Sequence, residues 1–229
     1  MLEIQGKHGK KGTKKITGAI FDADGTLLDS MQMWGRIEID FLISLGVTPR
    51  PGLREVLRSL GGHEVPEYFR IEYGVDMTID EISAGINALI EESYFQKVPL
   101  KHGVVRVLDL FRDRGVRMCV ASATDRYLIE AALRRCGIDE YFGRVFSCGD
   151  EGTSKSDTKI FYRAAAFLGT DVRNTLVVED ALYAMRTAKS AGFPVVAVFD
   201  ASWGDRTEDI KDLCDHYFIK MDEMLDVII

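Results

Sequence analysis

Two aspartates, separated by one residue, stand directly after a short apolar run and could carry out phosphoryl transfer. Asp22 and Asp24 follow the run 16–21, and Gly25 comes next and permits a tight turn. A carboxylate oxygen aimed in line at phosphorus forms an acyl phosphate that water later cleaves, so Asp22 is a candidate nucleophile. Asp24 can point elsewhere, which suits it to protonate a leaving alcohol and then to take a proton from the attacking water.

A second acidic pair follows another apolar run and, together with the first pair, predicts a divalent-cation site. Carboxylates brought together repel one another, and their burial is costly unless a cation compensates. Oxygen ligands without histidine or cysteine favour Mg²⁺, which is therefore the predicted cofactor. The candidate ligands are Asp22, Asp24, Glu179 and Asp180.

A phosphorylated substrate would also need local donors, because the chain is acidic overall. Its formal net charge is −7 and its pI about 5.2, which repels a phosphate ester at long range. Lys155, just before a helical pattern, and Ser122, just after an apolar run, are the candidates to hold phosphate oxygens.

Each of these residues has an ordinary structural interpretation when it is taken alone. An Asp-x-Asp-Gly-Thr run is commonly a polar turn, and Ser122 could cap a helix. Lys155 could be solvated, and the pair 179–180 could favour the N-terminus of the helix that follows. Their appearance in order, at successive strand ends, is what favours a functional site.

The elements that must position these residues form an alternating pattern. Apolar runs of strand length are followed by helical patterns that close with glycine. The runs are 16–21, 116–121, 175–178 and 195–199, and the helical patterns include 126–136, 159–168 and 182–191. Strands alternating with helices predict the α/β class with a Rossmann-like parallel sheet, in which ligands gather beyond the carboxyl ends of the strands.

Residues 31–97 show no strand pattern and predict an inserted all-helical domain. Thr78 and Glu81 form a candidate capping box, and 57–63 is a candidate substrate-facing loop. The core domain is then 16–30 and 98–229, with hinges near 29–30 and 98–100. Residues 1–15 carry five lysines and are interpreted as a flexible basic tail.

Composition excludes several classes of protein. No apolar run approaches the roughly 20 residues that cross a bilayer. The acidic balance disfavours nucleic acid as a partner, and the four scattered cysteines fit a reducing cytoplasm. We expect a soluble cytoplasmic protein, a monomer or weak dimer without a membrane partner, that acts on a small phosphorylated metabolite such as a sugar phosphate.

The run Asp22-Ala23-Asp24-Gly25-Thr26-Leu27-Leu28-Asp29-Ser30 resembles the first motif of the haloacid dehalogenase superfamily, in its phosphatase and phosphoglucomutase branch with a helical cap. Ser122, Lys155 and the pair 179–180 match the second, third and fourth motifs. The resemblance spans about 16–199, with 31–97 in the position of the cap. It implies a central parallel sheet with helices on both faces and a mobile cap of the C1 type.

The resemblance also implies roles for single residues. Asp22 would be nucleophile and Mg²⁺ ligand, Asp24 the acid/base that offers its backbone carbonyl to the metal, and Asp180 the completing ligand. Glu179 would assist. Ala123 stands where asparagine is common, so it would offer only its backbone N–H to phosphate.

Three functions stay open at this point. The leading hypothesis is a Mg²⁺-dependent phosphatase that works through an aspartyl phosphate. A β-phosphoglucomutase-like sugar-phosphate mutase would use the same nucleophile but retain the phosphoenzyme. A non-catalytic phosphoaspartate or metal-binding module is the third, although such receivers are small single domains. A true dehalogenase would need no metal, which disfavours it.

Overall fold

The computed structural model describes residues 2–5, 13–60 and 64–227. The chain divides into two compact units. The first, called the core unit here, comprises Met1–Met31 and Pro99–Ile229, and the second, called the helical unit, is Gln32–Val98. These bounds lie within one residue of the predicted inserted domain, 31–97. Among the described residues, no helix has the length and apolar character needed to cross a membrane.

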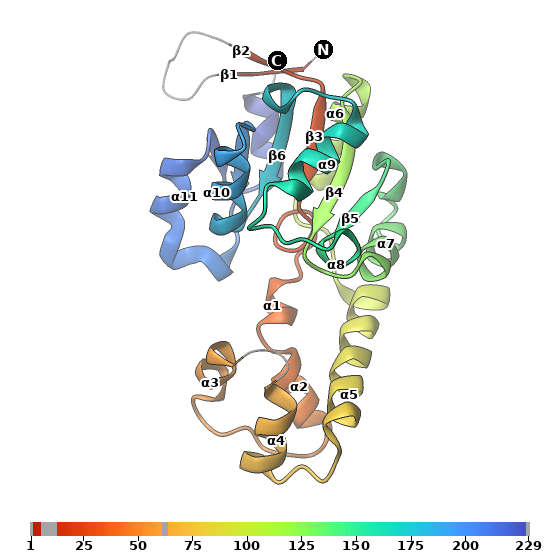
Figure 1. The fold of residues 1–229 in the computed structure, drawn as a ribbon, viewed down its shortest axis with the longest axis vertical. Helices are drawn as coiled ribbons and strands as arrows, with labels where there is room; N and C mark the ends of the chain where they lie inside the picture. The colour runs from red at the N-terminus through yellow and green to blue at the C-terminus, as the bar shows by residue number, and fades with distance from the viewer. Residues whose placement is uncertain (1, 6–12, 61–63, 228–229) are drawn as a thin grey trace. The chain divides into compact units, whose positions relative to one another are not determined.

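The described residues of the core unit form a six-stranded parallel sheet in the order β5-β4-β3-β6-β7-β8. Four of these strands, β5, β4, β3 and β6, are labelled in Figure 1. The strands are β3 (Gly18–Phe21), β4 (Arg117–Ser122), β5 (Val145–Ser147), β6 (Thr175–Glu179), β7 (Val195–Val198) and β8 (His216–Phe218). The predicted α/β class is confirmed. The sequence runs had located four of these strands, whereas β5 and β8 have three residues each and are too short for a periodic pattern to identify.

Successive residues of β3 pack on opposite faces of the sheet, which explains its continuous apolar run. Ile20 belongs to a buried cluster that includes Ile160 of α9 (Lys159–Leu168) and Met185 of α10 (Leu182–Ser190). Its neighbour Phe21 contacts Phe111 of α6 (Val104–Asp113), with ring centroids 5.7 Å apart. Strand β3 is therefore fixed from both sides at the point where the segment with Asp22 and Asp24 begins.

Further helical segments complete the core unit. They are α7 (Arg126–Arg135), α8 (Cys148–Glu151), α11 (Thr207–Leu213) and the 3₁₀ turns η3 (Asp139–Tyr141), η4 (Val172–Asn174), η5 (Ala201–Arg206) and η6 (Met221–Asp226). The predicted helical patterns 126–136, 159–168 and 182–191 correspond to α7, α9 and α10, with ends that agree to within one residue.

The N-terminal segment differs from the predicted flexible tail. β1 (Leu2–Gln5) and β2 (Thr13–Ile16) pair as an antiparallel ladder in which Leu2 lies opposite Ile16. Both of these side chains are buried, so apolar contacts order the pair despite the neighbouring lysines. Residues 6–12, part of the predicted tail, lie outside the described residues. The predicted run 16–21 is divided at Thr17, whose N–H donates to Asn174 O at 2.9 Å.

The helical unit is all-helical in its described residues, as the sequence predicts. Its helices are α1 (Met31–Trp34, which begins at the unit boundary), α2 (Ile37–Ser44), α3 (Leu53–Ser59), α4 (Val65–Tyr73), α5 (Ile79–Glu92) and the π-helical turn η2 (Ser93–Lys97). The Thr78–Glu81 capping box is present at the start of α5. Phe41, Phe69 and Ile82 lie in the buried cluster of this unit. Residues 61–63 of the predicted loop 57–63 lie outside the described residues.

The chain leaves and re-enters the core unit at adjacent positions. Leu28 and Leu100 form an isolated antiparallel bridge. Asp29 N–H donates to Pro99 O, and Lys101 N–H donates to Leu27 O, both at 2.9 Å. The two predicted hinge segments are therefore held together by backbone hydrogen bonds.

Candidate active site

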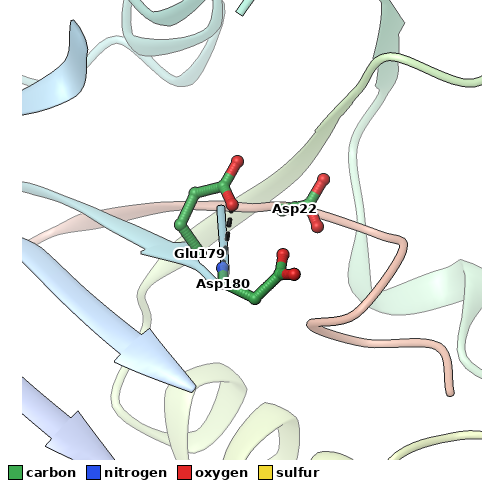
Figure 2. A group of neighbouring side chains, drawn as sticks. All are labelled: Asp22, Glu179 and Asp180. Atoms are coloured by element: carbon green, nitrogen blue, oxygen red, sulfur yellow. Dashed lines mark hydrogen bonds between the residues drawn. The ribbon is translucent and has the colours of Figure 1, made fainter. Parts of the chain in front are cut away.

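Three carboxylates meet at the carboxyl edge of the two central strands. Asp22 follows β3, Glu179 ends β6, and Asp180 comes next; β3 and β6 are neighbours in parallel register, with Phe21 opposite Val178. Each of the three residues offers a carboxylate oxygen within 4.8 Å of the others, and all three are buried. Figure 2 shows these carboxylates converging from the two strand ends. The predicted meeting of the first and fourth motif regions is thus present in the fold.

Lys155, in the segment before α9, inserts its ammonium into this group. Its Nζ donates to Asp22 Oδ1 and, at 2.6 Å, to Glu179 Oε1. The lysine side chain is only 4% exposed. Among the described residues, one ammonium therefore contacts a cluster of three carboxylates, and the formal charge of this group is negative when all four side chains are ionised.

The hydrogen bonds in the cluster are unevenly distributed. Glu179 Oε2 accepts from the backbone N–H groups of Asp180 and Ala181, both at 2.8 Å (Figure 2 marks the first). Within the described part of the chain, Asp22 Oδ2 is buried and has no hydrogen-bond donor. A buried, unpaired carboxylate oxygen beside surplus negative charge is the environment that a hard divalent cation stabilises. The residues present therefore fit such an ion.

Burial and neighbouring negative charge raise the pKa of Asp22 and of Asp180. Burial raises the pKa of Asp22 to about 6; Lys155 opposes this rise and Glu179 adds to it. Burial, followed by the charges of Glu179 and Asp22, raises the pKa of Asp180 well above its usual range. Burial disfavours the charged form of Lys155, but Asp22 and Glu179 outweigh it and raise the pKa of that lysine. A bound cation would relieve the carboxylate repulsion.

The side chain of Asp24 is held apart from the three-carboxylate group by two hydroxyls. Its Oδ1 accepts from Ser30 Oγ at 2.6 Å, and its Oδ2 accepts from Thr124 Oγ1 at 2.8 Å. The first carboxylate of the motif thus belongs to the buried cluster, while the second is held by hydroxyl donors. The ligand role that the resemblance implies for Asp24 uses its backbone carbonyl, so it does not require the carboxylate to join the cluster.

Ser122 and Ala123 lie at the carboxyl end of β4, the strand next to β3. Ser122 is buried, and its Oγ accepts from Thr124 N–H at 3.0 Å. The hydroxyl oxygen is the acceptor in this bond, so the bond does not use the hydroxyl proton as a donor. Ala123 follows with an exposed side chain. Thr124 and Ser30 were not predicted as site residues, although both stand inside the motif segments and carry the hydroxyl that a carboxylate needs.

Gly25 and Thr26 position Asp180 from the other side of the cluster. Gly25 has φ +88°, and a Cβ at this position would collide with the Asp180 carboxylate. Thr26 Oγ1 donates to Asp180 Oδ1 at 3.3 Å. The absence of a side chain at residue 25 and the hydroxyl at residue 26 together allow the fourth motif to approach the first.

The sequence model of the haloacid dehalogenase-like hydrolases matches residues 16–192. Hexitol phosphatase B from Escherichia coli is 27% identical over 201 residues, which cover 81% of this chain and 84% of that protein. The 6-phosphogluconate phosphatase of the same organism is 24% identical over 185 residues, covering 79% and 81%. A candidate beta-phosphoglucomutase from Thermotoga maritima has the same fold, with a TM-score of 0.82 at 18% identity, over 93% of this chain and 98% of that one.

Proposed function

Because the chain belongs to the haloacid dehalogenase-like hydrolase family, we propose that it is a Mg²⁺-dependent phosphatase that hydrolyses a small phosphorylated metabolite through an aspartyl phosphate on Asp22. The family match confirms the predicted superfamily and the hydrolase class, and relatives that are phosphatases support phosphoric monoester hydrolysis. The observation that carries the mechanism is the buried Asp22 Oδ2, which has no donor in the described chain and lies among surplus carboxylates.

The first half-reaction forms a bond between Asp22 and phosphorus. As that bond forms, the bond between phosphorus and the ester oxygen breaks, and Asp24 gives its proton to the departing oxygen. In the second half-reaction, water attacks the phosphorus of the acyl phosphate, and the ionised Asp24 takes a proton from that water. Phosphate leaves, and Asp22 is again a carboxylate. The hydroxyls of Ser30 and Thr124 hold Asp24 in place for both steps.

In this proposal, different groups of residues bind the phosphate and the metal. We assign the phosphate to the ammonium of Lys155, the hydroxyl of Ser122 and the backbone N–H of Ala123. The carboxylates of Asp22 and Asp180, with the backbone carbonyl of Asp24, would hold Mg²⁺, which neutralises negative charge on phosphate oxygens when it is bound. Glu179 fixes the Asp180 and Ala181 amides and the Lys155 ammonium, so it supports the ligands rather than reacting.

The substrate we propose is a phosphorylated sugar, sugar alcohol or sugar acid. The names of the two bacterial relatives, hexitol phosphatase and 6-phosphogluconate phosphatase, support this class for the present chain. The inserted helical unit is the part of the chain to which we assign the choice among such substrates, in the role of a cap.

Turnover of an aryl phosphate by the purified protein tests the proposal. We expect phosphate release that requires Mg²⁺ and is lost in Asp22→Asn. Absence of any metal-dependent release would favour a binding module. A sugar monophosphate supplied with its bisphosphate then separates phosphatase from mutase: interconversion of the sugar phosphates without phosphate release would identify a mutase, which would use the same Asp22.

The cellular setting that we propose is the cytoplasm, with the protein acting as a monomer or weak dimer without nucleic acid or membrane. The free thiols of Cys119, Cys136, Cys148 and Cys214 support a reducing compartment. Fractionation of cells and size-exclusion chromatography of the purified protein test the two parts of this statement separately.

A further inference from the structure

A second lysine, the partly buried Lys101, contacts the loop that carries the acid/base. Its Nζ donates to Gly25 O at 2.5 Å, to Phe199 O at 2.7 Å and to Asp200 Oδ2 at 2.8 Å. An ammonium has three protons, so each of the three finds an acceptor. The side chains of Lys101 and Asp200 are 13% and 6% exposed. All three ammonium protons are therefore hydrogen-bonded, and the carboxylate of Asp200 balances the charge. The ammonium links the loop after β3 to the loop after β7.

Lys101 contacts the loop of the candidate site through the Gly25 carbonyl. Gly25 stands between Asp24 and Thr26, and Thr26 in turn donates to the Asp180 carboxylate. A glycine at φ +88° has more conformational freedom than any other residue would have there. A tether on its carbonyl therefore limits rotation of the Gly25–Thr26 peptide, which follows the acid/base by one residue.

The lysine is itself held rigidly. Its own N–H donates to Leu27 O at 2.9 Å. Asp200 Oδ1 accepts from the backbone N–H of Ser202 at 2.9 Å and from its Oγ at 2.7 Å. Backbone pairing on one side and a fixed carboxylate on the other define where the ammonium lies, so it can define where the Gly25 carbonyl lies.

We propose that Lys101 is a positioning residue for the reaction: through the Gly25 carbonyl it holds the Asp24–Thr26 loop in the geometry that catalysis requires. This statement rests on the proposed function for its catalytic consequence, but not for the tether itself. A misplacement of about 1 Å in a reacting group can cost about 10²-fold in rate. Loosening the loop should therefore lower kcat while leaving most substrate contacts intact.

The variant Lys101→Met removes the ammonium and keeps a chain of similar length. For aryl phosphate hydrolysis we expect kcat to fall about 10–100-fold, with KM changed less than about 3-fold, because Lys101 contacts the loop and is not among the assigned phosphate-binding groups. The matched control is Lys189→Met. Lys189 is a half-buried lysine that donates to Asp215 Oδ2 at 3.0 Å, at the end of α10 opposite the catalytic edge.

Amide hydrogen exchange of the metal-free proteins supplies a readout that does not need activity. The amides of Gly25, Leu27 and Leu28 are hydrogen-bonded within the loop. In Lys101→Met we expect the peptide across 22–28 to exchange at least about 10-fold faster, with strand peptides unchanged, and we expect no such change in Lys189→Met. If wild type lacks turnover, the proposed function fails while this exchange result still tests the tether.

Two outcomes would overturn the proposal. One is a folded Lys101→Met with wild-type kcat and wild-type loop exchange. The other is an equal fall of kcat in Lys189→Met, which would trace the effect to general stability. Should Lys101→Met not fold, Asp200→Asn takes its place: it weakens the anchor while Lys101 keeps both carbonyls, so a smaller effect on loop exchange and kcat supports the tether and no effect on either refutes it.

Discussion

Two lysines at the carboxyl edge of the sheet, Lys155 and Lys101, lie in opposite electrostatic surroundings. Lys155 contacts two of three clustered carboxylates, and one oxygen of Asp22 has no donor in the described chain. Lys101 has one carboxylate and two carbonyls, and its carboxylate partner is fully hydrogen-bonded. Lys155 is buried, Lys101 is partly buried, and both contact segments of the candidate site.

The difference separates reacting groups from groups that hold them. A cluster with surplus charge and an unpaired oxygen is costly for the fold and is retained where it binds something. A balanced cluster with every proton used contributes rigidity. Burial of a charged residue therefore does not by itself point to a reacting group, whereas unmet charge at a strand end supports the proposed reacting role of Asp22.

Removal of the proposed nucleophile in the Lys155 cluster should cause the largest loss of activity. We expect Asp22→Asn to lower kcat by about 10⁴-fold or more, the scale seen when a nucleophile is lost, because the amide cannot form the acyl phosphate. Steady-state hydrolysis of an aryl phosphate measures this, with an unchanged circular dichroism spectrum as the control for folding. Near-normal turnover would refute the assignment of Asp22.

The acid/base should show a smaller loss. Asp24→Asn removes the proton donor and acceptor of both half-reactions, and we expect kcat to fall on the order of 10²-fold or more. Rapid-quench measurement of phosphoenzyme formation and breakdown reports the two steps separately. An effect confined to KM would contradict the role of Asp24 and would reduce it to a loop residue.

Metal addition should distinguish the two lysine clusters without any substrate. At Mg²⁺ concentrations about 100 times Kd, binding contributes about 2.7 kcal/mol, which for a chain of this size raises Tm by about 5–10 °C. Calorimetry should show this rise in wild type and in Asp200→Asn, and its loss in Asp180→Asn. A rise that survives in Asp180→Asn would place the metal elsewhere.

The charge-balanced pair of Lys101 and Asp200 should make the stability of the fold depend on pH. Burial alone would raise the pKa of Asp200, but hydrogen bonds from Lys101 and Ser202 outweigh it and hold that pKa below its usual range. A depressed carboxyl pKa stabilises the fold above the unfolded-state value of about 3.9, and this contribution is lost as the pH falls through the folded-state pKa. Urea unfolding should therefore show a stability difference between wild type and Asp200→Asn at pH 7 that shrinks below about pH 4. A difference independent of pH would argue against this source of stability.

The sequence alone was enough to predict the strands that carry the motifs. Apolar runs such as 175–178 end in charged residues, and in a parallel sheet those ends converge at one edge. The same convergence predicts from the sequence that Asp22, Lys155, Glu179 and Asp180 lie close together.

The supporting contacts could not be predicted in the same way, because they depend on three-dimensional register rather than on periodicity. Thr124 reaches Asp24 across 100 positions of the chain, and Lys101 reaches Gly25 across 76. Neither has a local pattern that distinguishes it from an ordinary threonine or lysine. The pairing of Leu2 with Ile16 was missed for a different reason: the lysines between them outweighed the apolar residues in the interpretation of the segment.

The bridge between Leu28 and Leu100 has a consequence for how such proteins diversify. Since Asp29 N and Pro99 O are 2.9 Å apart, the stretch between them begins and ends at almost the same place. Recombination could lengthen, shorten or exchange that stretch while β3 and β4 keep their positions. The bridge would let the same candidate site be combined with many different helical insertions over evolutionary time.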